Sequence, residues 1–210
     1  MSGDSVIRKT PYTTFIKPLL DRVLAIMLFV PLSPVLLVLA LLVAFTSKGP
    51  IFFRQQRIGR YRTKFFIFKF RSMYVDAPKD TPTHLLTNAA SHITPVGRFL
   101  RKSSLDELPQ IFNILNGTMS FIGPRPALWN QYDLVDERDR WGANAVTPGI
   151  TGWAQVTGRD ELPIPVKAER DGYYAQNLSF ALDAKILFLT FVNVLFAKGV
   201  REGAAGDENK

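Results

Sequence analysis

The chain has 210 residues, enough for one compact domain with a membrane element but hardly for two independent enzymes. Its 26 Lys and Arg against 18 Asp and Glu give a formal charge of +8, so an anionic partner is expected: phospholipid, nucleotide or nucleic acid. The lack of cysteine excludes disulfides, thiolate catalysis and Cys-ligated zinc, and with two histidines a His-rich metal site is excluded, which leaves carboxylate-bound Mg²⁺ as the natural metal.

An uncharged apolar segment extends from Val23 to Phe45, about 23 residues, which is enough for a helix to cross a bilayer core. It is too long for a secretory signal peptide, and no small-residue cleavage site follows it. An ordinary spanning helix should carry Lys and Arg mainly on one flank. Here both flanks are basic, with Arg8, Lys9, Lys17 and Arg22 before the segment and Lys48, Arg54, Arg57, Arg60, Arg62 and Lys64 after it. We therefore expect both ends on the cytoplasmic side.

Two prolines lie in the middle of this segment. Pro31 and Pro34 lack a backbone donor, and Ser33 can hydrogen-bond a carbonyl that the interruption frees. A break at Ser33–Pro34 would return the chain to its starting face as a re-entrant helix, whereas a simple kink in a spanning helix is the alternative. The two basic flanks favour the re-entrant arrangement.

The next segments are short. Residues 51–59 and 63–73 alternate apolar with basic side chains, which predicts strands or amphipathic pieces at a lipid surface and a β-hairpin turning near Ile58–Gly59–Arg60. Residues 75–92 lack periodicity and predict a loop, a candidate lid. Residues 97–115 predict a helix in two parts, ended by Gly117.

The second half of the chain predicts three helices and a structured loop. The helices are expected over residues 129–140, 167–176 and 183–196, and the last is apolar on nearly every side yet too short to span a membrane. It should lie in the membrane interface or against the re-entrant helix. Residues 147–163 are dense in glycine and predict a structured loop, and the tail from Gly199 is polar.

Asp106 and Glu107 are the first candidates for chemistry. Ser104 to Glu107 matches a capping box, which would make both acids parts of a helix start. Pro109 offers a second interpretation, because proline suits the first helical position and would leave the acids just ahead of a helix N-terminus, where phosphate binds well. Adjacent carboxylates can hold a divalent cation, and a carboxylate can also attack phosphorus to form an acyl phosphate.

Such a reaction needs positive charge near the transferred phosphoryl group. The candidates for contacts with the substrate phosphates are Lys69, Arg71, Arg101 and Arg125, the last within a rigid Pro-Arg-Pro unit. The alternative is that basic residues near a membrane meet lipid headgroups. The sequence has no Walker-type phosphate loop and no GxGxxG fingerprint, so nucleotide binding would use another scaffold.

Several sequence blocks follow one another in a specific order: the apolar segment with Ser33–Pro34, then KFRSM, SLDELPQIFNIL, MSFIGPRP, PGITGWAQVTGR and YYAQNLSFALDAKIL. Together they resemble the small monotopic phosphoglycosyl transferases, the bacterial sugar transferase family, over residues 17–203. The resemblance implies an α+β, mainly helical fold. Its parts would be residues 1–47 with the re-entrant membrane helix, a catalytic domain over residues 48–198 with interfacial amphipathic helices, and a polar tail over residues 199–210.

The resemblance also implies an activity at the cytoplasmic face of the bacterial inner membrane. Members of the family move a sugar phosphate from a UDP-sugar to undecaprenyl phosphate, release UMP and use Mg²⁺. Carried onto this chain, Asp106 would be the nucleophile that forms a phosphosugar–aspartyl intermediate, and Glu107 would help to bind Mg²⁺ and assist deprotonation of the lipid phosphate. Because both substrates then meet one aspartate in turn, ping-pong kinetics are expected.

Other interpretations remain open at this point. An anchored phosphatase could use an aspartyl phosphate, although its DxDx[TV] motif is absent, and a non-enzymatic basic module could bind membrane phospholipids. The apolar segment accounts for much of the charge as flanking anchors, so we expect no nucleic-acid partner. The sugar is expected, by resemblance, to be an N-acetylated amino sugar; Gln155 and Arg159 are candidates for a uridine or sugar pocket, and Trp153 is more simply core. The oligomeric state stays open.

Overall fold

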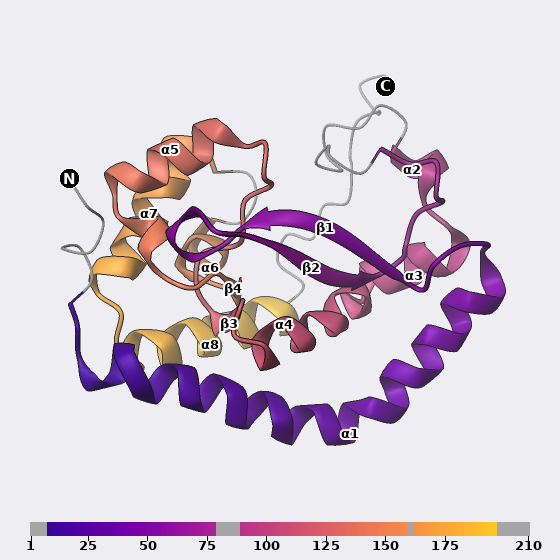
Figure 1. Ribbon diagram of the computed structural model, residues 1–210, viewed down its shortest axis with the longest axis horizontal. Coiled ribbons are helices and arrows are strands. Elements are labelled where there is room, and N and C mark those ends of the chain that lie inside the picture. The colour runs from indigo at the N-terminus through magenta and orange to yellow at the C-terminus, as the bar shows by residue number, and fades with distance from the viewer. Residues whose placement is uncertain (1–7, 79–88, 159–161, 197–210) are drawn as a thin grey trace.

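The computed structural model describes residues 8–78, 89–158 and 162–196. One long helix, α1 (Lys17–Thr46), lies along one side of the molecule, and the other elements lie together on its concave side (Figure 1). A short π-helical stretch, Tyr12–Ile16, leads into it. The fold is mainly helical, with one antiparallel strand pair and one short parallel pair, so the expected α+β class is confirmed.

Helix α1 bends rather than breaks at its prolines. The helix continues through Pro31 and Pro34, and Figure 1 shows both its ends rising to the same side from a bend near its middle. Ser33 Oγ donates to the Val30 carbonyl at 2.7 Å, the oxygen that Pro34 cannot reach because it lacks an N–H group. The expected serine hydrogen bond is therefore confirmed, while the expected interruption of the helix is replaced by a bend.

Most of α1 faces away from the protein. Within the described residues, Tyr12–Thr46 is the one helix long and apolar enough to cross a membrane, and only 17% of its most apolar window is buried. Its buried residues are few: Lys17, Ala25, Leu36, Leu39 and Val43. The core helix of a soluble protein would be mostly buried, so this exposure favours a lipid environment.

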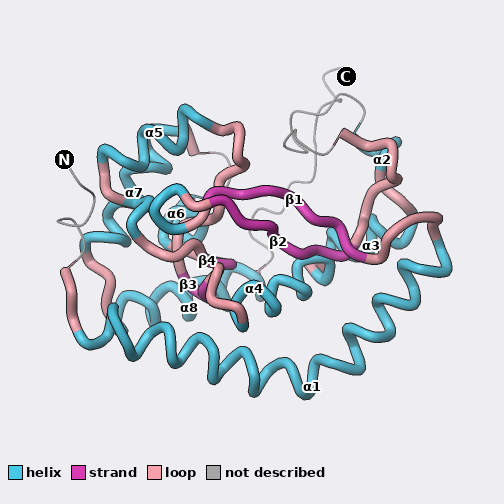
Figure 2. The backbone as a smooth tube through the Cα atoms, viewed as in Figure 1, coloured by secondary structure: helices cyan, strands magenta, loops and turns pink. Residues whose placement is uncertain are grey.

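The strands β1 (Phe52–Ile58) and β2 (Lys64–Phe70) form the predicted antiparallel hairpin (Figure 2). Its turn passes through a 3-10 segment, Arg60–Arg62, in which Tyr61 has a φ of 53° and Arg62 a φ of 60°. The register pairs Phe53 with Lys69 and Arg57 with Phe65. Because side chains alternate between the faces of a strand, Arg57 and Lys69 share one face of the hairpin.

The predicted two-part helix is present. It consists of α3 (Pro95–Lys102), a 3-10 segment Leu105–Gln110 and α4 (Ile111–Leu115), and Gly117 follows with a φ of 80°. Pro109 lies inside the 3-10 segment, so the expectation that an α-helix starts at Pro109 is wrong by two residues. Of the predicted loop over residues 75–92, residues 89–92 form α2 (Ala89–His92), and residues 79–88 lie outside the described residues.

The strands β3 (Ser120–Ile122) and β4 (Gly149–Thr151) pair in parallel. A side chain at Gly123 or Gly149 would collide with the other strand's backbone, so the absence of a Cβ permits this close approach. The predicted structured loop over residues 147–163 therefore contains a strand, and after it α6 (Trp153–Gly158). Both elements are too short to have a readable hydrophobic period.

Three further helices complete the body: α5 (Tyr132–Arg140), α7 (Ile164–Gln176) and α8 (Phe180–Leu195). They confirm the predicted helices with shifts of three residues at their starts. The tail from Gly199 lies outside the described residues. Helix α8 keeps its apolar face exposed, with Phe188, Phe191 and Val194 all more than 60% accessible.

A buried polar network joins the start of α1 to this body. Lys17 Nζ lies 2.8 Å from Asp183 Oδ2, which also accepts a hydrogen bond from the Tyr12 hydroxyl at 2.6 Å. The Tyr174 hydroxyl donates to Asp183 Oδ1 at 2.8 Å and lies 3.0 Å from the Ile122 carbonyl. The network thus ties α1 to α7, α8 and β3.

Candidate active site

Asp106 and Glu107 lie in the 3-10 segment just ahead of α4. Ser104 precedes them in the left-handed region with a φ of 55°, and its side chain makes no cap hydrogen bond. The Glu107 carboxylate turns to other partners, so the capping-box interpretation is wrong. Both acids are therefore available for a role other than starting a helix.

Glu107 binds two cations from distant parts of the chain. Its Oε1 accepts from Lys69 Nζ at 2.6 Å and from Arg125 Nη2 at 2.8 Å. Burial raises the pKa of Glu107, but Arg125 and Lys69 outweigh it and hold that pKa well below its usual range. Glu107 is thus a fixed negative charge that holds two positive groups in place.

Asp106 differs from its neighbour. It is 8% exposed, and burial raises its pKa, while Lys69 and Arg101 lower it and the negative charge of Glu107 raises it. The net shift is upward, so its carboxylate is more basic than an ordinary aspartate's. A buried, partly desolvated carboxylate that feels the charges of Lys69 and Arg101 suits attack on an anionic phosphoryl group.

Asn113 fixes the distance between the hairpin and the acidic segment. Its amide donates to the Phe66 carbonyl at 2.8 Å, and its Oδ1 accepts from the Phe68 N–H at 3.0 Å. The side chain therefore continues the hydrogen-bonding edge of β2, one residue before Lys69. These two hydrogen bonds hold β2 so that Lys69 lies next to Glu107.

Arg125 follows β3 on a loop that is held from two sides. On one side, Arg57 Nη1 donates to the Pro126 carbonyl at 3.0 Å, and the Ile58 N–H donates to the Ala127 carbonyl at 2.9 Å. On the other, Arg138 donates to the Arg125 carbonyl at 2.9 Å while its Nε binds Asp171 at 2.9 Å. Arg138 and Asp171 are both almost fully buried, so α5 and α7 set the position of the loop.

Arg57 belongs to this site, although the sequence presented it only as a flanking basic residue. Burial lowers its pKa to about 10, with Arg125 adding to the decrease and Glu107 opposing it. Its Nε is buried without a hydrogen-bond partner in the described part of the chain. The strand alternation that puts Arg57 and Lys69 on one face was the signal that could have identified it.

The remaining predicted site residues fall in three places. Arg101, on α3, acts electrostatically on Asp106, and Lys69 and Arg125 bind Glu107, so these three cations lie around the acidic pair. Arg71 is 5% exposed and donates to the Ser47 and Pro50 carbonyls at the end of α1. Its predicted phosphate contact is not supported by this position, because the guanidinium holds backbone instead. Arg159 lies outside the described residues.

Gln155 lies on α6 behind the β4 strand. Its Nε2 donates to the Ile150 carbonyl at 2.9 Å, and its Oε1 is buried without a partner among the described residues. Trp153 packs against Tyr173 with ring centroids 5.6 Å apart and joins the apolar cluster around Ile122, as the core interpretation expects. The proposed contact of Gln155 with uridine or sugar stays a prediction.

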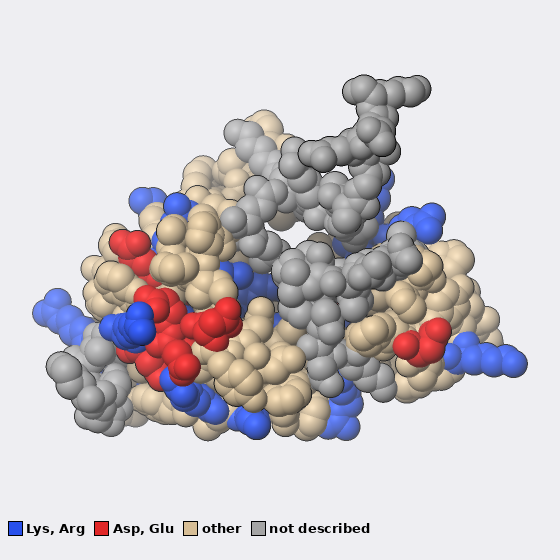
Figure 3. Space-filling model, turned by 90° about the horizontal axis from the view of Figure 1, so that it is seen from above, with Lys and Arg blue, Asp and Glu red and all other residues tan. Residues whose placement is uncertain are grey.

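The acidic pair can serve a metal only with help from a substrate. The described residues contain no group of three or more His, Cys, Asp or Glu side chains placed to hold a metal ion. Mg²⁺ commonly uses one or two carboxylates together with substrate phosphates and waters, so Asp106 and Glu107 fit that mode. Figure 3 shows Lys and Arg side chains inside a hollow on the face away from α1, beside acidic side chains gathered over α5.

Comparison with known proteins gives consistent matches. The sequence profile described as "Bacterial sugar transferase" matches residues 12–197. A UDP-glucose:undecaprenyl-phosphate glucose-1-phosphate transferase of Xanthomonas campestris is 43% identical over 194 residues, covering 89% of this chain and 40% of the relative. The uncharacterized sugar transferase EpsL of Bacillus subtilis is 39% identical over 187 residues, covering 89% of this chain and 91% of EpsL.

A third relative differs in the sugar that its name carries. A UDP-N-acetylgalactosamine-undecaprenyl-phosphate N-acetylgalactosaminephosphotransferase of Aeromonas hydrophila is 39% identical over 201 residues, covering 91% of this chain and 46% of the relative. The chain therefore spans less than half the length of the Xanthomonas and Aeromonas proteins and nearly all of EpsL.

Proposed function

Because the chain belongs to the bacterial sugar transferase family, we propose that it transfers a sugar 1-phosphate from a UDP-sugar to undecaprenyl phosphate and releases UMP. This would be the first membrane step of glycoconjugate assembly. The proposal is supported by the names of the Xanthomonas and Aeromonas relatives, which both specify undecaprenyl phosphate. Those names carry glucose and N-acetylgalactosamine respectively. An N-acetylated amino sugar is the first donor to test.

One observation carries the mechanism: Asp106 is buried beside a second carboxylate whose charge is already taken by Lys69 and Arg125. Glu107 is thereby fixed as an anion, and Lys69, one of its two cations, also acts electrostatically on Asp106. The two neighbouring acids thus have different environments and different tasks. Asp106 is the proposed nucleophile, and Glu107 holds the phosphate-binding cations.

In the first half-reaction, an Asp106 oxygen attacks the phosphorus that bears the sugar. A P–O bond forms to Asp106, the bond between that phosphorus and the bridging oxygen breaks, and UMP leaves with the electron pair. Lys69, Arg101 and Arg125 stabilise the charge that develops on the phosphoryl oxygens. The product is a phosphosugar–aspartyl intermediate.

In the second half-reaction, a phosphate oxygen of undecaprenyl phosphate attacks the same phosphorus. The P–O bond to Asp106 breaks, the carboxylate is restored, and the lipid diphosphate sugar leaves. The low pKa of Glu107 makes it a weak base, so its support of this step is electrostatic. Because UMP leaves before the lipid reacts, the proposed kinetics are ping-pong.

Mg²⁺ is the proposed cofactor, and the Asp106 and Glu107 carboxylates would hold it together with the donor diphosphate. When bound, it would neutralise phosphate charge and act as a Lewis acid. The protein cations Lys69 and Arg125 would neutralise the rest. Removal of Mg²⁺ by a chelator should therefore stop turnover, and readdition should restore it.

The proposed location is the cytoplasmic face of the inner membrane, with α1 entering and leaving the bilayer on one side. The bend of α1 and its exposed apolar surface support this monotopic arrangement (Figure 1). The exposed Phe188, Phe191 and Val194 of α8 suit an interfacial helix that contacts phospholipid. The Lys17–Asp183 pair places the starts of α1 and α8 together.

The test uses the purified full chain with a panel of UDP-sugars and undecaprenyl phosphate, and it measures UMP. One donor should give UMP release that requires Mg²⁺, and mass spectrometry with donor alone should find the sugar phosphate on the Asp106 peptide. Asp106→Asn should abolish both signals, whereas Asp76→Asn, an exposed control, should keep them. Near-wild-type turnover of Asp106→Asn contradicts the mechanism, and phosphate release to water without lipid favours a phosphatase.

A further inference from the structure

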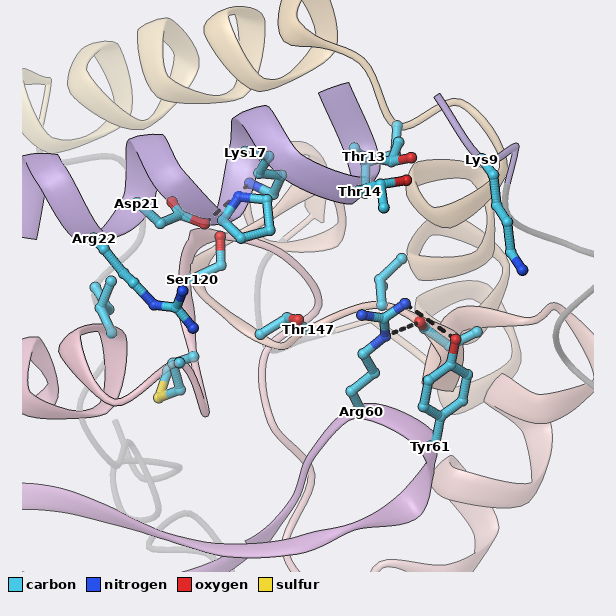
Figure 4. A pocket seen from close by; sticks show the side chains of 17 residues that line it. Lys9, Thr13, Thr14, Lys17, Asp21, Arg22, Arg60, Tyr61, Ser120 and Thr147 are labelled. Carbon is cyan, nitrogen blue, oxygen red and sulfur yellow. Dashed lines mark hydrogen bonds and ion pairs between the residues drawn. The ribbon is translucent and has the colours of Figure 1, made fainter. Parts of the chain in front are cut away.

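A second polar pocket lies at the other end of α4 from the acidic pair. It has a volume of about 260 Å³ and is lined by residues of α1, the β1–β2 turn, the end of α4 and the segment before β4. Figure 4 shows Arg22 entering it from α1 and Arg60 from the opposite wall, with Thr147 between them. None of Lys69, Asp106, Glu107 and Arg125 lines this pocket.

Several side chains that line this pocket are hydrogen-bond donors. Lys9, Thr14, Arg22 and Thr147 make no side-chain hydrogen bond or ion pair within the described part of the chain. Arg60 donates to the Ala145 carbonyl at 2.9 Å and to the Tyr61 hydroxyl at 3.0 Å, both neutral, so its charge is not compensated by an acid there. These side chains are mostly exposed to solvent, so the argument rests on their convergence: several cations and hydroxyls around one cavity favour an anionic ligand.

The charge balance of the pocket also favours an anionic ligand. Lys17 also lines it but is neutralised by Asp183, and Asp21 is the one carboxylate among its lining residues. Lys9, Arg22 and Arg60 therefore outnumber it.

The position of the pocket identifies the source of the anion. Arg22 is the last charged residue before the uncharged segment Val23–Phe45, so it marks the level at which α1 leaves water. At that level the abundant anions are lipid phosphates. Gly117, whose missing side chain leaves room for Arg22, opens the pocket to this level.

We propose that this pocket binds the phosphate group of a membrane lipid, separately from the acidic site, through Lys9, Arg22, Arg60 and the Thr14 and Thr147 hydroxyls. An anionic phospholipid headgroup and the phosphate of the acceptor lipid share this chemistry. A bound headgroup would hold the N-terminal half of α1 at a fixed depth beneath the hairpin. The inference rests on the membrane placement proposed above and not on the chemistry of Asp106.

The test is native mass spectrometry of the full chain in detergent, with phosphatidylglycerol, undecaprenyl phosphate, diacylglycerol and inorganic phosphate added separately. The wild type should retain a lipid with a phosphate and not diacylglycerol. Lys9→Gln with Arg22→Gln should weaken retention about 30-fold, since each cation near a membrane surface contributes about 1 kcal/mol. The matched control, Arg8→Gln with Lys48→Gln, removes the same charge outside the pocket and should retain lipid as the wild type does.

Two further variants distinguish loss of the lipid site from loss of folding. Thr147→Val removes a hydroxyl without changing charge or size and should weaken retention about fivefold, as for one neutral hydrogen bond. Asp106→Asn should retain lipid fully even though it lacks turnover. If Asp106→Asn loses the lipid, retention belongs to the acidic site and the proposal is overturned.

The remaining outcomes distinguish a phospholipid headgroup from the acceptor lipid as the source of the phosphate. Retention of phosphatidylglycerol that depends on Lys9 and Arg22 supports a headgroup site, and the same dependence with undecaprenyl phosphate alone supports a site for the acceptor. Equal binding of inorganic phosphate, or equal loss in the pocket variant and the control, overturns a lipid site. Failure of UMP release with lipid retention intact would reject the proposed function and leave this inference standing.

Discussion

At the scale of single residues, the two adjacent carboxylates of the site differ in their partners and in their pKa values. Glu107 receives Lys69 and Arg125 and has a pKa well below its usual range, while burial gives Asp106 a raised pKa. A carboxylate with two cations is a poor nucleophile, since its electrons are already engaged in charge-assisted hydrogen bonds. The less neutralised Asp106 is the better one.

The pKa of Asp106 predicts where activity falls on the acid side of the pH profile, its acid limb. Burial raises this pKa, and the positive charge of Arg101 opposes the increase. The attacking carboxylate must be ionised, so activity should fall as the pH drops through the pKa of Asp106. Arg101→Gln removes a charge that lowers the pKa, and so the limb should move to higher pH. The measurement is the pH dependence of adduct formation with donor alone, with the exposed neighbour Lys102→Gln as control; coincident limbs in all three proteins would reject the prediction.

We expect that lysine cannot replace Arg57 without a loss of activity. Its guanidinium binds the Pro126 carbonyl and Gln55 at once, and a lysine cannot span both. Arg57→Lys should lower kcat/KM for the donor by about 10-fold or more, as for one buried charged hydrogen bond. Arg54→Lys, on the opposite face of β1 against the Phe66 ring, is the control and should stay near wild type. Equal activity of both variants would remove Arg57 from the site.

At the scale of elements, Asn113 on α4 links the acidic segment to the hairpin. Asn113 is 1% exposed and pairs with the backbone of both Phe66 and Phe68. Asn113→Leu should lower the free energy of unfolding by about 2–4 kcal/mol, because two backbone groups lose their partner. Thermal or denaturant unfolding measures this, with the exposed Asn177→Leu as control. A similar small change in both variants would contradict this role.

Local sequence signals predicted the ends of elements correctly. The predictions were wrong where contacts between distant residues decided the structure. Gly117 and the alternation of the hairpin residues predicted a helix end and two strands. The capping box at Ser104 matched its local pattern but was overridden, since Glu107 found Lys69 and Arg125, separated from it by 38 and 18 residues. Strand β4 gave no signal because three residues have no measurable period.

Helix α1 gives a prediction about sidedness. Its two ends lie on the same side of the bend, so residues beyond both ends should face the same compartment (Figure 1). The chain lacks cysteine, and therefore Ser2→Cys and Lys48→Cys each give a unique label site. Both should react with an impermeant thiol reagent in inverted membrane vesicles and neither in intact spheroplasts. Labelling from opposite sides would establish a spanning helix.

At the scale of the whole molecule, apolar and polar surfaces lie on different sides. The exposed apolar residues of α1 and α8 include Met27, Leu37 and Phe188, while acidic and basic side chains gather on the face away from α1 (Figure 3). The sequence predicted this division through its apolar segment. It did not predict which polar residues meet across the division, since Lys17 and Asp183 are separated by 166 residues and neither stands in a recognisable local motif.

That long-range pair gives the last prediction. Asp183 is 4% exposed and accepts hydrogen bonds from Lys17, Tyr12 and Tyr174. Asp183→Asn removes the carboxylate nearest to the buried Lys17 charge and leaves it Asp21 at 3.9 Å, so the free energy of unfolding should fall by about 3 kcal/mol.

Removing both charges should be less harmful than removing one. In Lys17→Met with Asp183→Asn, both charges of the pair are gone, Asp21 loses only a 3.9 Å contact with Lys17, and the asparagine can still accept from Tyr174. The double variant should therefore be more stable than Asp183→Asn alone, as measured by denaturant unfolding in detergent. If the destabilisations of Lys17→Met and Asp183→Asn simply add, the two residues do not act as a pair, and α1 must be held to the body mainly by its apolar contacts with α4, such as the packing of Phe29 against Phe112.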